Sequence, residues 1–297
     1  MKKMIWAAWV ALFCYHGSAN ATLNVVATYG WIGDLVQQIG QERVAVTVLA
    51  QASFDPHFVP PKPSLAVKLR NADLLVINGG QLEMGWLPPV LRQASNARIQ
   101  PNSEGFLDLS SLVTLSNPRP HATRADGDVH PDGNPHYVFN PDNMAALAYG
   151  VAHQLCHLDK AGCGFYEQSL ARFDERWQKE KQGWQQRLLP LKGKQLVQYH
   201  ESFDDLAYWL GMTVVANVEP VPGVPPSASH LEKLLKRLAD QQVVMVIQEH
   251  FRDREATEWL AKQRQVKWQV LPSDVGATPK SKDLFSWFNE LVERLAP

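Results

Sequence analysis

The first half of the chain alternates between two hydrophobic periods. Short runs of β-branched and other apolar residues are followed by stretches in which apolar positions recur at the spacing of an amphipathic helix. The pattern predicts strands at residues 23–28, 44–49 and 73–77, and helices at residues 31–39, 63–71 and 86–94. Such alternation is typical of a parallel sheet that is covered by helices on both faces.

A long helix is predicted in the middle of the chain, at residues 165–189. Phe173, Trp177 and Trp184 mark its apolar side, and charged residues occupy the rest. At 1.5 Å per residue this helix would be about 37 Å long, enough to contact two lobes at once. After it the alternation returns, with strands predicted at residues 195–199, 213–217, 243–248 and 266–271 and helices at residues 203–210, 230–240, 252–264 and 282–295.

These patterns predict an α/β fold of two Rossmann-like lobes, each a mainly parallel sheet flanked by helices, bridged by one long helix. The expected boundaries are residues 22–160 for the N-terminal lobe, 161–190 for the linking helix and 191–297 for the C-terminal lobe. Residues 116–133 interrupt the first series, because they are rich in Pro, Asp, Gly and His and lack apolar periodicity. We expect them to form an exposed, mobile loop.

Residues 1–21 have the three parts of an export signal peptide. Two lysines are followed by an apolar run at residues 4–15 and by a small-residue cleavage site, Ala19-Asn20-Ala21. The apolar run is too short to span a bilayer, and no later stretch is apolar enough to do so. We therefore expect cleavage after Ala21, a location in the periplasm and no direct insertion into the membrane.

Export determines how the charge and the cysteines are interpreted. The chain has 29 basic and 30 acidic side chains; without the two lysines of the signal peptide, 27 and 30 remain, a formal charge of −3. This balance excludes the basic face that binding to nucleic acid would need. Cys156 and Cys163 remain as a closely spaced pair, which favours a disulfide in an oxidising compartment, with two buried thiols as the alternative.

Two histidines lie in proline-containing loops. His57 follows Pro56 and precedes three further prolines, and Pro135 and His136 repeat the Pro-His pair. Proline fixes its own φ and biases the preceding residue toward an extended conformation, so both imidazoles are mounted on stiff segments. Imidazole is the commonest metal ligand in proteins. A single loop of this kind is a weak signal, but its repetition favours a metal site.

Further candidate ligands lie at the carboxyl ends of predicted strands. His200 and Glu249 end two strands of the second series, and Asp274 follows a third; His57 likewise follows a strand of the first series. Ligands of open α/β sheets bind at this edge. If the two lobes face each other, these side chains and His136 form a site in the cleft between them.

The other histidines have plainer interpretations. His153 and His157 are four residues apart on a predicted helix, a spacing that can bind zinc, but they have no evident carboxylate partner. We interpret them as surface or core residues. His121 and His130 lie in the predicted mobile loop, where they either capture metal loosely or belong to a solvated linker.

Taken together, the motifs resemble those of the zinc/manganese-type periplasmic solute-binding proteins that feed ABC importers. The similarity covers essentially the whole mature chain in order and spacing, and the motifs are specific jointly rather than singly. The matching segments are Asp55-Pro56-His57, Asn134-Pro135-His136-Tyr137, Asn140-Pro141, Tyr199-His200-Glu201-Ser202-Phe203, Glu219-Pro220, Pro222-Gly223-Val224-Pro225-Pro226-Ser227 and Asp274-Val275-Gly276.

The resemblance implies two α/β lobes bridged by one long helix, a metal ion held between the lobes, and the membrane permease of an ABC importer as partner. We also expect a monomer without enzymatic activity. Two features depart from the family pattern. Relatives selective for zinc often carry a long His-rich insertion before the second histidine, which is reduced here to a few residues around His121 and His130. The late aspartate, Asp274, also stands in a different local sequence.

The predicted ligand set favours zinc. Three imidazoles, from His57, His136 and His200, together with one carboxylate suit four-coordinate Zn²⁺, whereas Mn²⁺ prefers more oxygen donors. Mn²⁺ or another divalent transition metal is the alternative. The resemblance favours Asp274 as the fourth ligand, with Glu249 as the alternative, because relatives also tend to carry that glutamate.

A secreted zinc hydrolase is the main competing hypothesis, with Glu201, next to His200, as general base. A catalytic zinc keeps one position open for water, whereas four protein ligands would close the site, and the chain has no H-E-x-x-H motif. A third hypothesis is an adhesin or sensor subunit that needs metal only for folding. A carrier differs from both because it binds one ion reversibly, stays folded without it and hydrolyses nothing.

Overall fold

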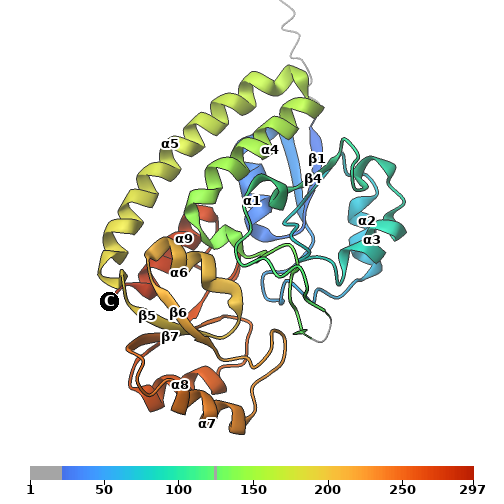
Figure 1. The fold of residues 1–297 in the computed structure, drawn as a ribbon. Helices are drawn as coiled ribbons and strands as arrows, with labels where there is room; N and C mark the ends of the chain where they lie inside the picture. Colours follow the sequence, from blue (N-terminus) through green and yellow to red (C-terminus); the bar gives the residue numbers. More distant parts are fainter. Residues whose placement is uncertain (1–21, 124–125) are drawn as a thin grey trace, which may run out of the picture.

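The computed structural model describes residues 22–123 and 126–297, so the predicted export signal lies outside the described residues. The described chain forms two lobes that a long helix joins along one side (Figure 1). Each lobe contains a four-stranded sheet in which all neighbouring strands are parallel. The predicted α/β fold class is confirmed.

The first sheet has the strand order β2-β1-β3-β4. Its strands are β1 (Leu23–Ala27), β2 (Val44–Val48), β3 (Leu74–Ile77) and β4 (Phe106–Asp108). Helices cover both of its faces: α1 (Gly30–Gly40) and α4 (Met144–Leu158) lie on one, and α2 (Pro63–Leu69) and α3 (Leu87–Ala94) on the other (Figure 1). The central strand β3 is buried at every position, as strands of covered parallel sheets are.

The second sheet has the order β6-β5-β7-β8. Its strands are β5 (Gln195–Gln198), β6 (Thr213–Asn217), β7 (Val243–Glu249) and β8 (Lys267–Leu271), and its helices are α6 (Asp204–Leu210), α7 (Ala228–Arg237), α8 (Glu255–Arg264) and α9 (Leu284–Leu295). Because side chains alternate along a strand, the two faces pack into different cores. Leu196 belongs to the large core that contains α6 and α9, and Val197 belongs to a smaller core with α7 and α8.

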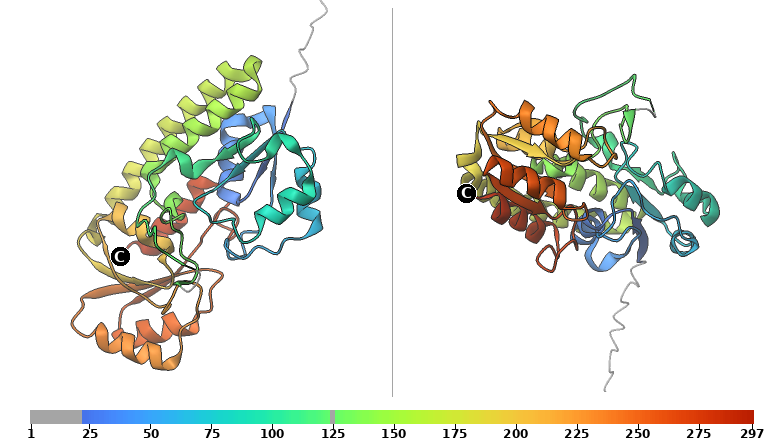
Figure 2. Two further views of the ribbon diagram at one scale, coloured as in Figure 1. Left: turned by 45° about the vertical axis from the view of Figure 1, so that its right-hand side comes forward. Right: turned by 90° about the horizontal axis from the view of Figure 1, so that it is seen from below.

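The bridging helix α5 (Cys163–Leu188) has 26 residues and runs along both lobes (Figure 2). The aromatic side that the sequence predicts packs against α9. The Trp177 ring centroid lies 5.5 Å from that of Phe285 and 5.1 Å from that of Phe288. The indole N–H of Trp177 also donates to the Pro141 carbonyl at 2.9 Å. The C-terminal helix is thereby built into the same core as the first lobe.

Two further contacts fix the lobes to each other near the cleft. Asp34, on α1, accepts a hydrogen bond from the Leu284 N–H at the start of α9 at 2.9 Å. In the reverse direction, Asp274 of the second lobe accepts from the N–H groups of Gly30 and Trp31, which begin α1, at 2.8 and 2.7 Å. A carboxylate at a helix N-terminus interacts favourably with its unpaired N–H groups. Each lobe therefore stabilises a helix start in the other.

Residues 116–133 form a loop that is exposed at many of its described positions, as the sequence predicts, but it is attached to the second lobe. Their described part packs across the second lobe: Arg119 forms two hydrogen bonds with Glu201 at 2.7 and 2.9 Å, and the Asp128 N–H donates to the Pro222 carbonyl at 3.0 Å. Strand β4 is also absent from the sequence prediction, because three residues are too few to show a period.

The structure joins Cys156, on α4, and Cys163, at the start of α5, in a disulfide with the Cα atoms 4.4 Å apart. This closes the turn between the two helices. Within the described residues, none of the helices combines the length and the apolar character needed to cross a membrane.

We predict that Trp177→Ala lowers the free energy of unfolding by about 3–5 kcal/mol, since it removes a fully buried indole from the contact between α5 and α9. Urea denaturation followed by far-UV circular dichroism measures this. Trp177→Phe is the matched control, because it keeps a ring in place and loses mainly the hydrogen bond to Pro141. Equal stability of the alanine variant and the wild type would contradict the proposed role of the aromatic contact.

Candidate metal centre

Three imidazoles meet in the cleft between the lobes. His57 lies in the loop that follows β2, His136 directly precedes the short helix Tyr137–Phe139, and His200 lies two residues after the end of β5. The ring centroids of His57 and His136 are 5.3 Å apart, those of His57 and His200 5.3 Å, and those of His136 and His200 5.5 Å. Each ring offers one nitrogen within 4.8 Å of the other two. The sequence-predicted histidines are therefore brought together, with each residue at most 7% exposed.

Two carboxylates orient these rings. Asp55 lies 2.8 Å from Nδ1 of His57, and Glu219 lies 2.8 Å from Nδ1 of His200. Because each Nδ1 then carries the proton that it donates to the carboxylate, each Nε2 is left as a lone pair facing the cleft. Nε2 of His136 is buried and has no hydrogen-bond partner among the described residues. A metal ion is a natural partner for a buried nitrogen of this kind.

The His57 loop is held by aromatic side chains of the first lobe. The Tyr29 hydroxyl donates to the Pro56 carbonyl at 2.9 Å, and the Trp86 indole N–H donates to the same oxygen at 3.1 Å. Asp55 also accepts from the backbone N–H of His57 at 3.0 Å. The short loop thus fixes both the backbone and the ring of His57.

The second Pro-His pair is held from both lobes. The Asn134 side chain accepts from the backbone N–H of His136 at 2.9 Å and donates to the Glu201 carbonyl of the second lobe at 2.8 Å. The Asn78 amide donates to the Pro135 carbonyl at 3.0 Å. His136 is therefore positioned by a loop that contacts both lobes.

A fourth imidazole, that of His130, adjoins the group. Its Nε2 lies 3.2 Å from Nε2 of His57, and the ring centroids are 5.2 Å apart. The sequence leaves open whether this residue captures metal or belongs to a solvated linker. In the structure it faces the cleft, because the loop that carries it packs on the second lobe.

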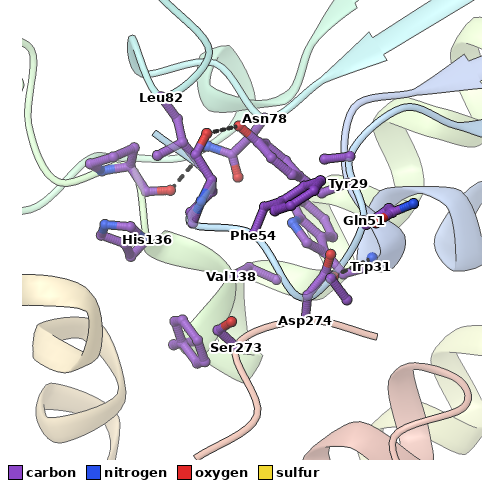
Figure 3. Close-up of a pocket in the computed structure, with 15 residues that line it drawn as sticks. Tyr29, Trp31, Gln51, Phe54, Asn78, Leu82, His136, Val138, Ser273 and Asp274 are labelled. Carbon is purple, nitrogen blue, oxygen red and sulfur yellow. Dashed lines mark hydrogen bonds between the residues drawn. The ribbon is translucent and has the colours of Figure 1, made fainter. Parts of the chain in front are cut away.

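Asp274 occupies a different position from the three histidines. One of its oxygens accepts from the Gly30 N–H, and the other accepts from the Trp31 N–H and from its own neighbour, the Val275 N–H, at 2.8 Å. Burial raises the pKa of this carboxyl to about 7 despite the three N–H donors. His136 and Asp274 line the same pocket, and Figure 3 shows them on different sides of it. Asp274 is not one of the three side chains that meet within 4.8 Å.

Glu249, the alternative fourth ligand, ends β7 and is fully buried. One carboxylate oxygen accepts from the Ser202 hydroxyl. The other has no hydrogen-bond partner in the part of the chain that the structure describes, and it lies 3.8 Å from Nε of Arg252. Glu249 also stands outside the three-histidine group.

The ionisable groups around the site shift one another's pKa values. Burial, followed by the charges of the neighbouring imidazoles, holds the pKa of His136 well below its ordinary value. For His200, burial acts in the same direction, but the hydrogen bond to Glu219 and the charges of Glu249 and Glu219 outweigh it and raise the pKa. For Asp55, burial is outweighed by the hydrogen bond to His57 and by the charges of His57 and Arg252, so its pKa falls to about 2. Acid therefore competes with a metal ion at His200 before it does so at His136.

Glu201, the general base of the hydrolase hypothesis, has a structural role instead. Arg119 holds both of its carboxylate oxygens, at 2.7 and 2.9 Å. A general base must be free to accept a proton from water, and an ion pair of this geometry opposes that.

Two parallel α/β lobes braced by one helix, with three imidazoles facing into the cleft, define the class of metal-binding solute-binding proteins that serve ABC importers; these proteins are not enzymes. Residues 25–297 match the family described as "ZnuA: Zinc-uptake complex component A periplasmic", and the chain belongs to that family.

Curated relatives are named for two metals. The chain is 24% identical over 279 residues to the zinc-binding lipoprotein AdcA of Streptococcus pneumoniae, an alignment that covers 91% of this chain and 55% of AdcA. It is 25% identical over 257 residues to the manganese ABC transporter substrate-binding lipoprotein PsaA of the same species, which covers 82% of this chain and 80% of PsaA. This chain thus spans about half the length of AdcA.

Solved structures share the fold. The crystal structure of ZnuA superposes with a TM-score of 0.73 at 21% sequence identity, covering 93% of this chain and 100% of that chain. At this identity the likeness extends to the fold alone.

Several residues of the centre have no role in the sequence prediction. Asp55 and Glu219 stand in the motifs that carry the family resemblance, but nothing in their spacing assigns each to a particular imidazole. Arg252, whose side chain reaches both of them, belongs to no motif. Its partners are 197 and 33 positions away in the sequence, so only the folded chain brings them together.

Proposed function

We propose that this protein binds one divalent transition-metal ion in the cleft between its lobes, zinc in preference to manganese, and delivers it to the membrane permease of an ABC importer. His57, His136 and His200 are the proposed ligands. The observation that carries the proposal is the convergence of three buried imidazoles from both lobes, two of them oriented by carboxylates on Nδ1.

The preference for zinc rests on the donor atoms. A set of three imidazole nitrogens with at most one carboxylate suits tetrahedral Zn²⁺, whereas Mn²⁺ favours oxygen donors in octahedral geometry. Relatives named for zinc and for manganese share the family, so the family name does not decide the metal for this chain. The proposal of zinc therefore rests on the donor atoms of the site.

The proposal includes the cellular setting. Residues 1–21 act as a signal peptide that is cleaved after Ala21, and the mature protein works in the periplasm as a monomer. Its parts are an N-terminal lobe at residues 22–160, a linking helix at 161–190 and a C-terminal lobe at 191–297. The contacts of α5 and α9 support a cleft that is braced from one side.

We predict that replacing His57, His136 or His200 with Ala weakens zinc binding by more than the 10–100-fold that loss of an orienting residue typically costs, because each variant loses a direct ligand. Competition with a chromophoric chelator measures the dissociation constant. His153→Ala is the matched control, since that imidazole stacks on Tyr149 of α4, away from the cleft. Unchanged affinity of the His136 variant, with unchanged circular dichroism, would refute the ligand set.

For the remaining coordination position we propose Asp274, with Glu249 as the alternative. An ionised carboxylate has about four lone-pair sites, and three N–H donors leave one of them for a metal ion. Among the described residues one oxygen of Glu249 accepts no hydrogen bond, and the charge of this carboxylate acts on His200. The contact between His130 and His57 adds a third candidate that reaches the cleft from the loop.

These three candidates predict different rankings in one zinc titration. We expect Asp274→Asn to weaken zinc binding more than Glu249→Gln or His130→Ala does. Loss of a ligand anion lowers the affinity more than loss of an orienting or capturing group. Thermal unfolding of the metal-free variants separates an effect on binding from an effect on the start of α1. A larger loss of zinc affinity in Glu249→Gln or in His130→Ala would identify that residue, rather than Asp274, as the fourth ligand.

A further inference from the structure

Arg252 connects the two lobes directly behind the metal centre. It lies in the second lobe between β7 and α8, and its side chain is 13% exposed. One terminal nitrogen, Nη1, lies 3.1 Å from an Asp55 oxygen in the first lobe and 3.3 Å from a Glu219 oxygen in the second. A single guanidinium group therefore forms ion pairs across the cleft.

The two carboxylates that Arg252 contacts are those that orient ligand histidines. Asp55 holds Nδ1 of His57, and Glu219 holds Nδ1 of His200, each at 2.8 Å. In both carboxylates the oxygen that faces the imidazole differs from the oxygen that faces Arg252. The guanidinium group thus completes a chain of contacts that runs from one imidazole to the other through both lobes.

Arg252 also offsets part of the negative charge beside the metal centre. It faces three buried or mostly buried carboxylates, those of Asp55, Glu219 and Glu249, at 3.1, 3.3 and 3.8 Å. These four formal charges sum to −2, which favours a divalent cation at the adjacent imidazoles. Without Arg252 the carboxylates would repel one another in a region with little water to screen them.

Two effects of opposite sign follow for a metal ion. The positive charge of Arg252 repels the ion, so removing it would tighten binding if charge alone mattered. Its contacts with Asp55 and Glu219 hold the imidazoles in a productive orientation, so removing it would weaken binding if positioning dominates. The direction of the change in affinity therefore distinguishes the two roles.

We propose that Arg252 is a positioning residue that couples the ligand histidines of the two lobes, by holding Asp55 and Glu219 against the Nδ1 atoms of His57 and His200. This inference rests on the proposed function, because it concerns the same metal centre. The planar guanidinium group suits the role, since it presents several donors in a fixed geometry, whereas a lysine ammonium is a point charge on a flexible stem.

The experiment compares zinc binding by wild type, Arg252→Gln, Arg252→Lys and Arg254→Gln. We expect Arg252→Gln to bind zinc 10–100-fold more weakly, in the range typical of lost orienting partners. Arg252→Lys should bind with intermediate affinity, because its ammonium group keeps the charge but sits on a flexible stem that does not fix the two carboxylates. Arg254 is two residues away and exposed, so Arg254→Gln should bind as the wild type does.

A double-mutant cycle tests the route of the effect. If Arg252 acts through Asp55 and Glu219, combining Arg252→Gln with Asp55→Asn or with Glu219→Gln should cost less than the sum of the single losses. The absorption spectrum of Co²⁺-loaded protein and the ring-nitrogen shifts of His57 and His200 in metal-free protein provide readouts beyond affinity. Both should change in Arg252→Gln while its circular dichroism remains that of the folded wild type.

Tighter or unchanged zinc binding by Arg252→Gln would overturn the positioning role. Strictly additive losses of zinc affinity in the double variants would overturn it as well. If Arg252→Gln does not fold, the comparison of Arg252→Lys with the wild type still tests it, since an unchanged Co²⁺ spectrum and affinity in the lysine variant would overturn the need for a bridging group. Failure of the wild type to bind zinc in the same titration would count against the proposed function itself.

Discussion

Burial of three imidazoles with their nitrogens facing one another is the constraint on which this structure depends. A buried nitrogen lone pair without a partner costs free energy. Nε2 of His136 is such an atom, with no hydrogen-bond partner among the described residues. The fold tolerates this arrangement because independent contacts hold the surrounding loops in place. A bound cation would supply the missing partner and make the free energy of the site favourable.

Those contacts come from a scaffold with little freedom to separate the lobes. The bridging helix α5 packs against α9, and α1 and α9 each receive a carboxylate from the opposite lobe at their N-terminal ends. The core of the first lobe continues through these helices to one face of the second sheet. The ligand histidines are therefore attached to two sheets that share one core, so their separation is set largely by packing. The Arg252 ion pairs add a polar link at the cleft itself.

Most of this architecture can be predicted from the sequence, because strands and helices leave local periods of hydrophobic residues. Strand and helix patterns predict the fold class, and the aromatic residues Phe173, Trp177 and Trp184 predict the buried side of α5. The three histidines can be found because proline-containing loops and strand ends are themselves sequence features. Strand β4 has too few residues to show a period, so it is missed.

The features that the sequence does not predict depend on contacts between distant segments. The loop with His130 looks solvated by composition, yet ion pairs and backbone hydrogen bonds attach it to the second lobe. Asp274 and Glu249 both lie at the expected sheet edge, but periodicity cannot say which oxygens are already engaged by backbone N–H groups. The pairing of Arg252 with Asp55 likewise has no local signal, because it exists only once the lobes face each other.

Zinc K-edge X-ray absorption of the loaded protein identifies the atoms bound to the metal. We expect a first shell of nitrogen and oxygen at about 2.0–2.1 Å, with the outer-shell scattering of three or more imidazole rings and no sulfur at about 2.3 Å. A shell containing sulfur, or one made of oxygen without imidazole scattering, would contradict the proposed ligand set.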